Sequence, residues 1–378
     1  MSAQRNSRYH ILWIWLGLIL FWVLAVYSVS IHESFTTTLG AIRRWTIDGD
    51  PSNYFYFIRH IRNLIVWLVM GMIVYKIPLS WYKKYYVIIF VVAVLFQLLV
   101  FTPLWDSFGK WARNWISVPG LGTVQPSEFF KLGFVIFLSA WLIRKRQLLT
   151  ELRWYVAFLI MVGACLFVYF LIPDLGTIMI LGLLSLLMYW YGGGKKRFVI
   201  SSVVLGLLVA VIAATQFTYI RDRLSFFVGW SEENLTNREV WRQQEQALMA
   251  IGGGWVFGKW YGKWLQKFWY IPEAQSDFIF AAFSEEIGFL GNSILLTLYF
   301  LLVYSMVHGM RRIHDPYYRI FGVGLISLLT IQAFVNMWVN TSILPNTGLT
   351  LPFISVWWTA LMSNIVSLVL MHKIVNES

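Results

Sequence analysis

The chain has 378 residues, of which 58% are hydrophobic and only 13% are charged. That charged share is about half that of soluble proteins, and with 21 Trp, 29 Phe and 19 Tyr it excludes an ordinary soluble fold. The formal charge of +12 does not imply a nucleic-acid partner, because much of it falls between predicted helices on one membrane face. The single cysteine, Cys165, excludes a disulfide framework and a thiolate metal cluster.

Ten apolar stretches are predicted to span a bilayer, which takes about 20 residues of helix. They cover residues 10–30, 58–77, 85–104, 127–144, 154–172, 176–191, 197–217, 277–307, 318–341 and 351–373. The sequence therefore predicts an all-α polytopic membrane protein. Residues 1–378 are expected to form a single integral membrane domain, with a large extracellular loop at about 218–276, between the seventh and eighth helices.

Lysine and arginine predict the orientation, because they are enriched in cytoplasmic loops. With the N-terminus inside, more than half of them fall in cytoplasmic segments, against only Glu151, Asp315 and Glu377 among the acids. Both termini are therefore expected in the cytoplasm, and the chemistry is expected on the outer face.

Four charged residues near the ends of predicted spans are candidates for substrate contact. Arg59 lies near the outer end of the second span, where an arginine either reaches the bilayer surface or binds phosphate. Glu128 and Lys131 are three residues apart on one helix face, so they form either a structural ion pair or part of a polar cavity. Asp174 stands in IPDLGT, where it either closes a turn or breaks a helix beside a water-filled cavity.

The long outer loop contains one predicted helix. A capping-box pattern at Thr236–Glu239 predicts that the helix begins there, and three glycines from Gly252 onward predict its end near Ile251. Helical spacing places four apolar residues on one face, namely Val240, Ala247, Leu248 and Ile251. We expect this helix to lie on the membrane or against the helix bundle.

Lysines follow this helix at four-residue spacing, at Lys259, Lys263 and Lys267, with tryptophans between them. The pattern is typical of an interfacial belt. It would equally place positive charge over a bound pyrophosphate, and the two interpretations are compatible.

The eighth predicted span begins with an acid, Asp277, and carries Glu285 and Glu286 farther along. At 1.5 Å per residue the glutamates lie about 12 Å beyond Asp277, near the middle of a hydrocarbon layer about 30 Å thick. A charge there costs at least about 2.5 kcal/mol. We therefore expect the glutamates to hold a polar interior together, and Asp277 to be available for chemistry at the outer boundary.

Several segments together resemble the SEDS family (shape, elongation, division and sporulation), which includes FtsW, RodA and SpoVE. They occur in family order between Trp111 and Ser355: WARNWI, QPSEFFKL, PDLGT, Q-x-x-x-AIGGG-x-x-FGK, YIPEAQSDFIFAAFSEEIGFLG and NTGLTLPFIS. The chain departs from the family at 356–359, where Val-Trp-Trp-Thr replaces a glycine-rich segment. Two indoles there are expected to push the last helix away from its neighbours.

The resemblance implies a peptidoglycan glycosyltransferase that polymerises lipid II on the outer face of the bacterial inner (plasma) membrane, for elongation, division or sporulation. It places the family's essential aspartate at Asp277. It also implies a class B penicillin-binding protein, a transpeptidase, as partner. Positions related to substrate binding are Gln246, Lys259, Glu273, Glu128 and Lys131.

A glycosyl transfer of this kind needs a base and positive charge, and the residues offer both. Asp277 would take the proton of the attacking hydroxyl, while Lys259, Lys263 or Arg59 would face the leaving pyrophosphate. The residues indicate no cofactor, although a divalent cation (magnesium or manganese) bound by carboxylates stays open. Two alternatives remain: a flippase for lipid-linked sugars, and a non-catalytic scaffold for the transpeptidase.

Overall fold

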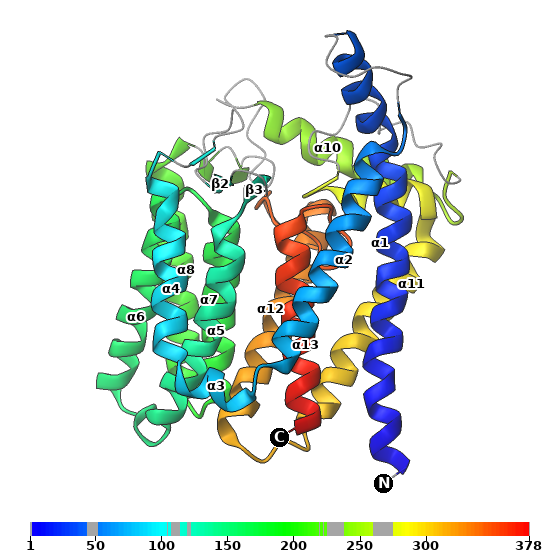
Figure 1. Cartoon of the computed structure of the whole chain (residues 1–378). Coiled ribbons are helices and arrows are strands. Elements are labelled where there is room, and N and C mark those ends of the chain that lie inside the picture. The colour runs from blue at the N-terminus through cyan, green and yellow to red at the C-terminus, as the bar shows by residue number, and fades with distance from the viewer. Residues whose placement is uncertain are drawn as a thin grey trace. The chain divides into compact units, whose positions relative to one another are not determined.

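The computed structural model describes residues 2–43, 52–103, 105–106, 114–118, 122–218, 220–221, 223–224, 238–259 and 275–377. Helices dominate this part of the chain (Figure 1). They are α1 Ser2–Arg43, α2 Phe55–Lys76, α3 Leu79–Lys84, α4 Tyr86–Leu98, α5 Pro126–Arg144, α6 Leu152–Leu171, α7 Leu175–Tyr191, α8 Lys196–Gln216, α10 Arg238–Gly253, α11 Ile279–Met310, α12 Pro316–Asn340 and α13 Trp358–Glu377. Two 3-10 helices, η1 Leu99–Phe101 and η2 Arg146–Leu148, follow α4 and α5.

The predicted all-α membrane architecture is confirmed. Among the described residues, seven helices are long and apolar enough to cross a membrane: α2, α5, α6, α8, α11, α12 and α13. Three shorter apolar segments, Trp13–Ser28, Tyr86–Phe101 and Leu175–Tyr191, match the remaining predicted spans. The helix predicted in the long outer loop is also present, as α10.

Two expectations about element boundaries were wrong. The last helix begins at Trp358, not at 351, because residues before it form an irregular loop around Pro352. The first helix continues to Arg43, well into the loop predicted from 31 onward. The loop after α4 contains three short strands, which were not predicted from the sequence.

These strands form an antiparallel sheet in the order β1-β2-β3, with bounds β1 Trp105–Asp106, β2 Trp115–Val118 and β3 Gly122–Val124. Ile116 pairs with Trp105 on one side and with Val124 on the other. Because β3 ends two residues before Pro126, the sheet connects directly to the start of α5.

The chain divides into two compact units. Unit 1 comprises 1–69, 212–302 and 332–361, and unit 2 comprises 70–211, 303–331 and 362–378.

In unit 1, α10 packs against the start of α11. Ala247 and Ala250 are fully buried and contact Phe278 and Ala281, with Ile251 at the edge of this cluster. The small side chains allow the two segments to approach closely. The helix after the capping box therefore leans on the bundle, which was one of the two expected positions.

In unit 2, α4 packs along α5, and α7 packs against both α5 and α6. A Cβ on Gly133 of α5 would lie 2.7 Å from the Ala93 side chain of α4, so glycine is needed at this helix crossing. Tyr189 donates a hydrogen bond to the Leu149 carbonyl at 2.6 Å, which fixes α7 to the turn after α5.

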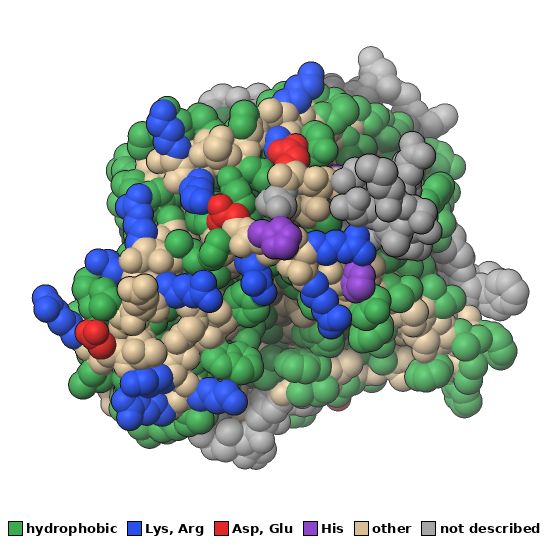
Figure 2. Space-filling model, turned by 90° about the horizontal axis from the view of Figure 1, so that it is seen from below, with side chains coloured by type: hydrophobic (Ala, Val, Ile, Leu, Met, Phe, Trp, Pro, Cys, Tyr) green, Lys and Arg blue, Asp and Glu red, His purple; other side chains and the backbone are tan. Residues whose placement is uncertain are grey.

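One end of unit 2 is strongly basic. In Figure 1, α3 and the turns after α5 and α11 lie at the lower end of this unit. Figure 2 views the molecule from that side and shows many Lys and Arg side chains with few acids. Exposed basic residues on α3, around these turns and around the turn between α7 and α8 include Lys83, Lys84, Arg144, Arg146, Arg153, Lys195, Lys196, Arg197, Arg311, Arg312 and Arg319. Such a concentration is typical of the cytoplasmic side of a membrane protein.

Candidate functional site

Asp277 lies in the turn just before α11, and two buried asparagines of α12 hold its main-chain carbonyl. The Nδ2 groups of Asn336 and Asn340 donate hydrogen bonds to this oxygen at 2.8 and 2.9 Å. Asn340 Oδ1 also accepts from the Ala281 N–H at 2.9 Å, which satisfies one of the free donors at the start of α11. The Asp277 main chain is therefore fixed, while its side chain is half-buried.

The loop between α12 and α13 closes over the same turn. Ser355 Oγ and the Val356 N–H donate to the carbonyls of the two residues that precede Asp277, at 2.7 and 3.1 Å. Gly348 in this loop has φ +69°, and a Cβ built on it would lie 3.5 Å from Asp277 Oδ2. The Asp277 carboxylate therefore lies beside this loop, and the loop is hydrogen-bonded to the main chain of the turn that carries Asp277.

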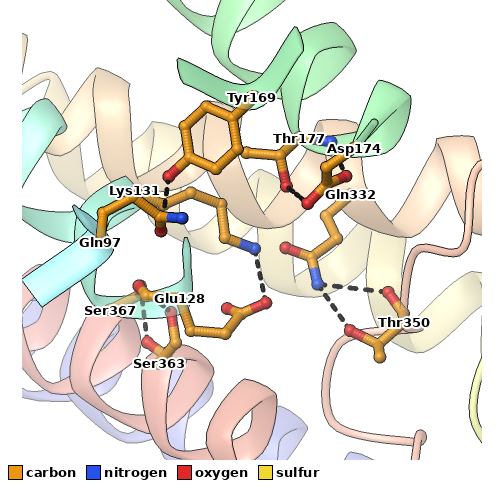
Figure 3. Close-up of polar contacts among 10 residues, drawn as sticks. All are labelled: Gln97, Glu128, Lys131, Tyr169, Asp174, Thr177, Gln332, Thr350, Ser363 and Ser367. Carbon is orange, nitrogen blue, oxygen red and sulfur yellow. Dashed lines mark hydrogen bonds and ion pairs between the residues drawn. The ribbon is translucent and has the colours of Figure 1, made fainter. Parts of the chain in front are cut away.

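This loop is in turn tied to α12 and α10. Gln332 of α12 donates to the Thr350 hydroxyl at 2.9 Å and to the Thr350 carbonyl at 3.2 Å (Figure 3). Gln243 of α10 accepts a hydrogen bond from Asn346 at 3.1 Å, and Gln244 donates to a loop carbonyl at 3.3 Å. The turn that carries Asp277 is thus supported by three elements of unit 1.

Farther along, α11 is broken at Gly288, where φ is 63° and ψ is −166°. Residues 254–259, here named the clasp loop, follow α10 and pack against this break. The N–H groups of the two residues after Gly288 donate to the carbonyls of Trp255 and Val256 at 2.9 and 3.1 Å. The clasp loop therefore supplies hydrogen bonds that the interrupted helix lacks.

Glycine is required on both sides of this contact. A Cβ on Gly254 would lie 2.3 Å from the Ser284 carbonyl oxygen, and one on Gly258 would lie 1.8 Å from the Glu286 oxygen. A Cβ on Gly288 would lie 2.2 Å from the Gly258 nitrogen. The glycines of the AIGGG-x-x-FGK and SEEIGFLG segments thus let the two main chains touch.

The glutamates of α11 are buried and bonded within unit 1, as expected for residues that hold a polar interior. Lys259 Nζ lies 2.6 Å from Glu285 Oε1, where the glutamate side chain is 1% exposed and the lysine 36%. The Ser28 hydroxyl of α1 donates to Glu286. Lys259, expected to face a pyrophosphate, therefore already has one anionic partner.

These glutamates were expected near the middle of the bilayer because the span was predicted to start at Asp277. The 32 residues of α11 exceed what a bilayer requires. The part from Gly288 to Met310 alone is about 34 Å long, and both glutamates precede it. They accordingly lie toward the N-terminal end of the span.

The candidates in unit 2 are buried within its own hydrogen-bond network (Figure 3). Lys131 Nζ lies 2.8 Å from Glu128 Oε1, with both side chains at most 4% exposed. Asp174 begins α7 and accepts hydrogen bonds from the Thr177 N–H at 2.9 Å and hydroxyl at 2.8 Å. The geometry matches the structural interpretations of both features: an ion pair and a helix cap.

The remaining predicted site residues are scattered. Arg59 is exposed on α2, and Gln246 is half-buried on α10 with an Oε1 that has no hydrogen-bond partner in the described part of the chain. Lys263 and Glu273 lie outside the described residues. Within the described ranges, no group of three or more His, Cys, Asp or Glu could hold a metal ion.

Sequence reasoning missed the residues that support Asp277. The sequence does not indicate that Asn336 and Asn340 share the Asp277 carbonyl as their hydrogen-bond acceptor. Gly348 and Ser355 were not singled out, although both stand in the uncharged segment 342–355. A run with glycine, serine and proline but no charge is typical of a loop packed on other main chain.

The comparisons with known proteins agree with this architecture. The FtsW/RodA/SpoVE family, described as "Cell cycle protein", matches residues 9–378. The probable peptidoglycan glycosyltransferase FtsW of Alcanivorax borkumensis is 32% identical, covering 83% of this chain and 81% of the relative. Stage V sporulation protein E of Bacillus subtilis is 34% identical, covering 73% and 74% of the two chains.

Solved structures share the fold. A chain from a study titled "Structural coordination of polymerization and crosslinking by a peptidoglycan synthase complex" superposes with a TM-score of 0.73 at 21% identity, covering 96% of this chain and 98% of that one. The rod shape determining protein RodA of Thermus thermophilus gives a TM-score of 0.67 at 19% identity, covering 97% and 96%. The match over nearly the whole sequence settles the family, and the chain belongs to the FtsW/RodA/SpoVE family of cell cycle proteins.

Proposed function

We propose that the chain is a peptidoglycan glycosyltransferase that polymerises lipid II. Similar proteins named FtsW carry this activity in their names. In the structure, the observation that carries the proposal is the half-buried Asp277 carboxylate, whose main chain is held by Asn336 and Asn340. A catalytic group needs this kind of fixed support, because small displacements of a reacting group sharply lower the rate.

The reaction joins a sugar hydroxyl to the anomeric carbon of a second, lipid-linked sugar. The new C–O bond forms as the bond to undecaprenyl pyrophosphate breaks, and the leaving group departs with the bonding electron pair. The hydroxyl proton passes to the Asp277 carboxylate, a step worth about 10²–10⁴-fold in rate. Pyrophosphate leaves as an anion without protonation, so one carboxylate suffices for a single inverting displacement.

Negative charge builds up on the departing pyrophosphate and requires positive charge nearby. Lys259 is paired with Glu285, but its side chain is 36% exposed and keeps donors available. Arg59 is exposed, and Lys263 and Glu273 are further candidates from the sequence. Gln246, whose buried Oε1 has no hydrogen-bond partner among the described residues, suits a hydrogen bond to a sugar hydroxyl or amide. A divalent cation, magnesium or manganese, would supply the same electrostatic stabilisation.

The proposal gives Glu128, Lys131 and Asp174 a structural role. Each is at most 7% exposed, and each already bonds within unit 2. A buried ion pair that loses one partner is strongly destabilising, by about 3–5 kcal/mol. These residues are therefore better suited to stabilising α5 and the start of α7 than to binding a sugar.

The proposed setting is the bacterial inner membrane, with both termini in the cytoplasm. The basic turns of unit 2 support this orientation, since lysine and arginine accumulate on the cytoplasmic side. A class B penicillin-binding protein is the proposed partner, and a solved structure from a study of a peptidoglycan synthase complex, whose fold is similar, supports it.

The test is polymerisation by the purified protein together with its transpeptidase partner. Labelled lipid II should yield long glycan strands with the unaltered chain and none with Asp277→Asn. A scaffold or a flippase would not depend on this carboxylate, so equal product from both proteins would overturn the proposal. A partner protein with an inactivated transpeptidase site keeps cross-linking from obscuring strand length.

A further inference from the structure

The clasp loop carries the two most exposed large apolar side chains in the described part of the chain. Trp255 is 82% exposed and Phe257 is 80% exposed. On α11, Phe289 at 67% and Leu290 at 46% extend the same surface, because their main chains bond directly to the clasp loop. Contiguous exposed apolar side chains of this size mark a contact surface.

Several main-chain groups of the clasp loop are paired, as contact with hydrocarbon favours. Trp255 and Val256 carbonyls accept from α11, and the Gly258 N–H donates to the Gly254 carbonyl at 2.8 Å. The Lys259 N–H donates to the Glu285 carbonyl at 2.9 Å. The Lys259 side chain forms an ion pair with the same glutamate, at 2.6 Å.

The clasp loop joins α11 where the membrane-exposed face of that helix begins. Residues 278–286 are all buried, and large exposed side chains on α11 start at Phe289. From Gly288 to Met310 the helix is about 34 Å long, enough to cross a hydrocarbon layer of about 30 Å. The clasp loop is therefore bonded to the N-terminal end of a full span (Figure 1), the level at which tryptophan is enriched in membrane proteins.

We propose that Trp255 and Phe257 insert into the bilayer leaflet at the N-terminal end of α11, which is the outer leaflet in the proposed orientation. Their contact is with the acyl chains and glycerol region of phospholipid. The clasp loop thereby anchors α10 to the membrane and fills the break in α11 from the lipid side. This inference stands independently of the catalytic proposal, because it uses no property of Asp277.

Site-directed spin labelling tests the insertion directly, since the chain has one native cysteine, Cys165. In a Cys165→Ala background, Trp255→Cys and Phe257→Cys are labelled separately and the full chain is reconstituted in phosphatidylcholine–phosphatidylglycerol vesicles. Two matched sites calibrate the measurement. Arg242→Cys marks the exposed surface of α10, and Ile294→Cys, at a residue 55% exposed on α11, marks the lipid.

Collision with oxygen and with a water-soluble nickel chelate gives the depth of each label. At both clasp positions we expect nickel collision at least about five-fold below that at Arg242→Cys, and a depth of about 5–10 Å below the headgroups. Nickel collision equal to that at Arg242→Cys would overturn the proposal. Shielding from both reagents would also overturn it, because it would mean that protein, such as a second copy of the chain, covers the loop. Gel filtration of each labelled variant establishes that it is folded.

Discussion

At the scale of single residues, two neutral amides hold the main chain of Asp277. Asn336 and Asn340 donate to its main-chain carbonyl, so they fix the residue without neutralising its carboxylate. A cation beside the carboxylate would lower its pKa and weaken it as a base, and these two amides add no charge. The two amides thus position the residue, and the carboxylate remains the group that accepts a proton.

Removing both amides should disturb the position of Asp277 while leaving the carboxylate that accepts the proton. Asn336→Ala/Asn340→Ala leaves the Asp277 carbonyl and the Ala281 N–H without these partners, at a cost of about 1–3 kcal/mol for each buried group. We expect kcat for lipid II polymerisation to fall about 10–100-fold, with KM changed far less. Steady-state rates and thermal unfolding in detergent measure both effects. A lowered unfolding temperature with unchanged kcat would show that the asparagines serve stability alone.

Gly348 offers a second test beside the same carboxylate. Its φ of +69° costs a residue with a Cβ about 1–2 kcal/mol, and relief of that strain would shift the loop next to Asp277. Gly348→Ala should therefore lower the polymerisation rate. Gly252→Ala at the end of α10 is the matched control, since its Cβ would meet nothing within 4 Å. Equal rates for the two variants would contradict the placement of this loop.

At the scale of elements, the clasp loop and α11 complete each other. An interrupted helix exposes N–H and carbonyl groups, which are costly to leave unpaired in a bilayer. The clasp loop pairs them from a segment about 30 residues earlier in the chain and adds an ion pair to Glu285. Neither element would be well formed without the other, which links α10 to the span that follows Asp277.

The glycine contacts predict which substitutions this junction tolerates. Gly258→Ala combines a φ of +80° with a Cβ that would lie 1.8 Å from the Glu286 oxygen, so main chain must move. We expect destabilisation by at least about 2 kcal/mol, seen as a lower unfolding temperature. Gly206→Ala in α8 meets nothing within 4 Å and should leave the temperature unchanged or slightly raised. The reverse order would refute the described contact.

The Lys259–Glu285 ion pair predicts non-additive effects. Lys259→Met leaves the buried Glu285 carboxylate without this cation and should destabilise by about 1–3 kcal/mol, since partial exposure of the lysine moderates the loss. Adding Glu285→Gln removes the buried charge and should restore part of that stability. Thermal unfolding of both single variants and the double variant gives the coupling. Additive losses would mean that the two side chains act separately.

At the scale of the whole molecule, sequence periodicity predicted the helices far better than their contacts. Apolar length identified ten spans because a bilayer imposes that length on each segment by itself. The helix α10 was predicted from local capping chemistry, but its buried face was predicted only in part. Leu248 was expected on that face and is exposed, whereas Ala250 is buried. Small residues on a helix carry little hydrophobic signal even when they mediate the closest packing.

The contacts that define the site join residues far apart in the chain, which no local pattern encodes. Asn336 and Asp277 are 59 residues apart, and Lys259 and Glu285 are 26 apart. The break at Gly288 is equally invisible to periodicity, since apolar residues continue through it. Of the two indoles expected to push the last helix away, Trp358 stacks on Trp67 within unit 1, with ring centroids 5.4 Å apart.

The basic end of unit 2 contains an ion pair that should make stability depend on pH. Desolvation raises the pKa of Asp315, but the hydrogen bond from Lys83 and those from main-chain N–H groups outweigh it and lower the pKa overall. A lowered folded-state pKa adds stability above the unfolded value of about 4, and that stability is lost as pH falls through the folded pKa. Asp315→Asn should therefore unfold at a lower temperature than the unaltered chain at pH 7, with the difference shrinking below about pH 4 and vanishing once the pH is below the folded pKa. A difference that persists at low pH, or one matched by Glu151→Gln, would contradict this.

The most direct measurement is the initial rate of glycan polymerisation from labelled lipid II, with the transpeptidase partner present and its own active site disabled. The account predicts that Asp277→Asn lowers this rate by at least about 100-fold, while Asp315→Asn, which removes a carboxylate in unit 2, leaves it within about two-fold. Comparable rates for Asp277→Asn and the unaltered chain, with both folded and bound to the partner, would contradict it.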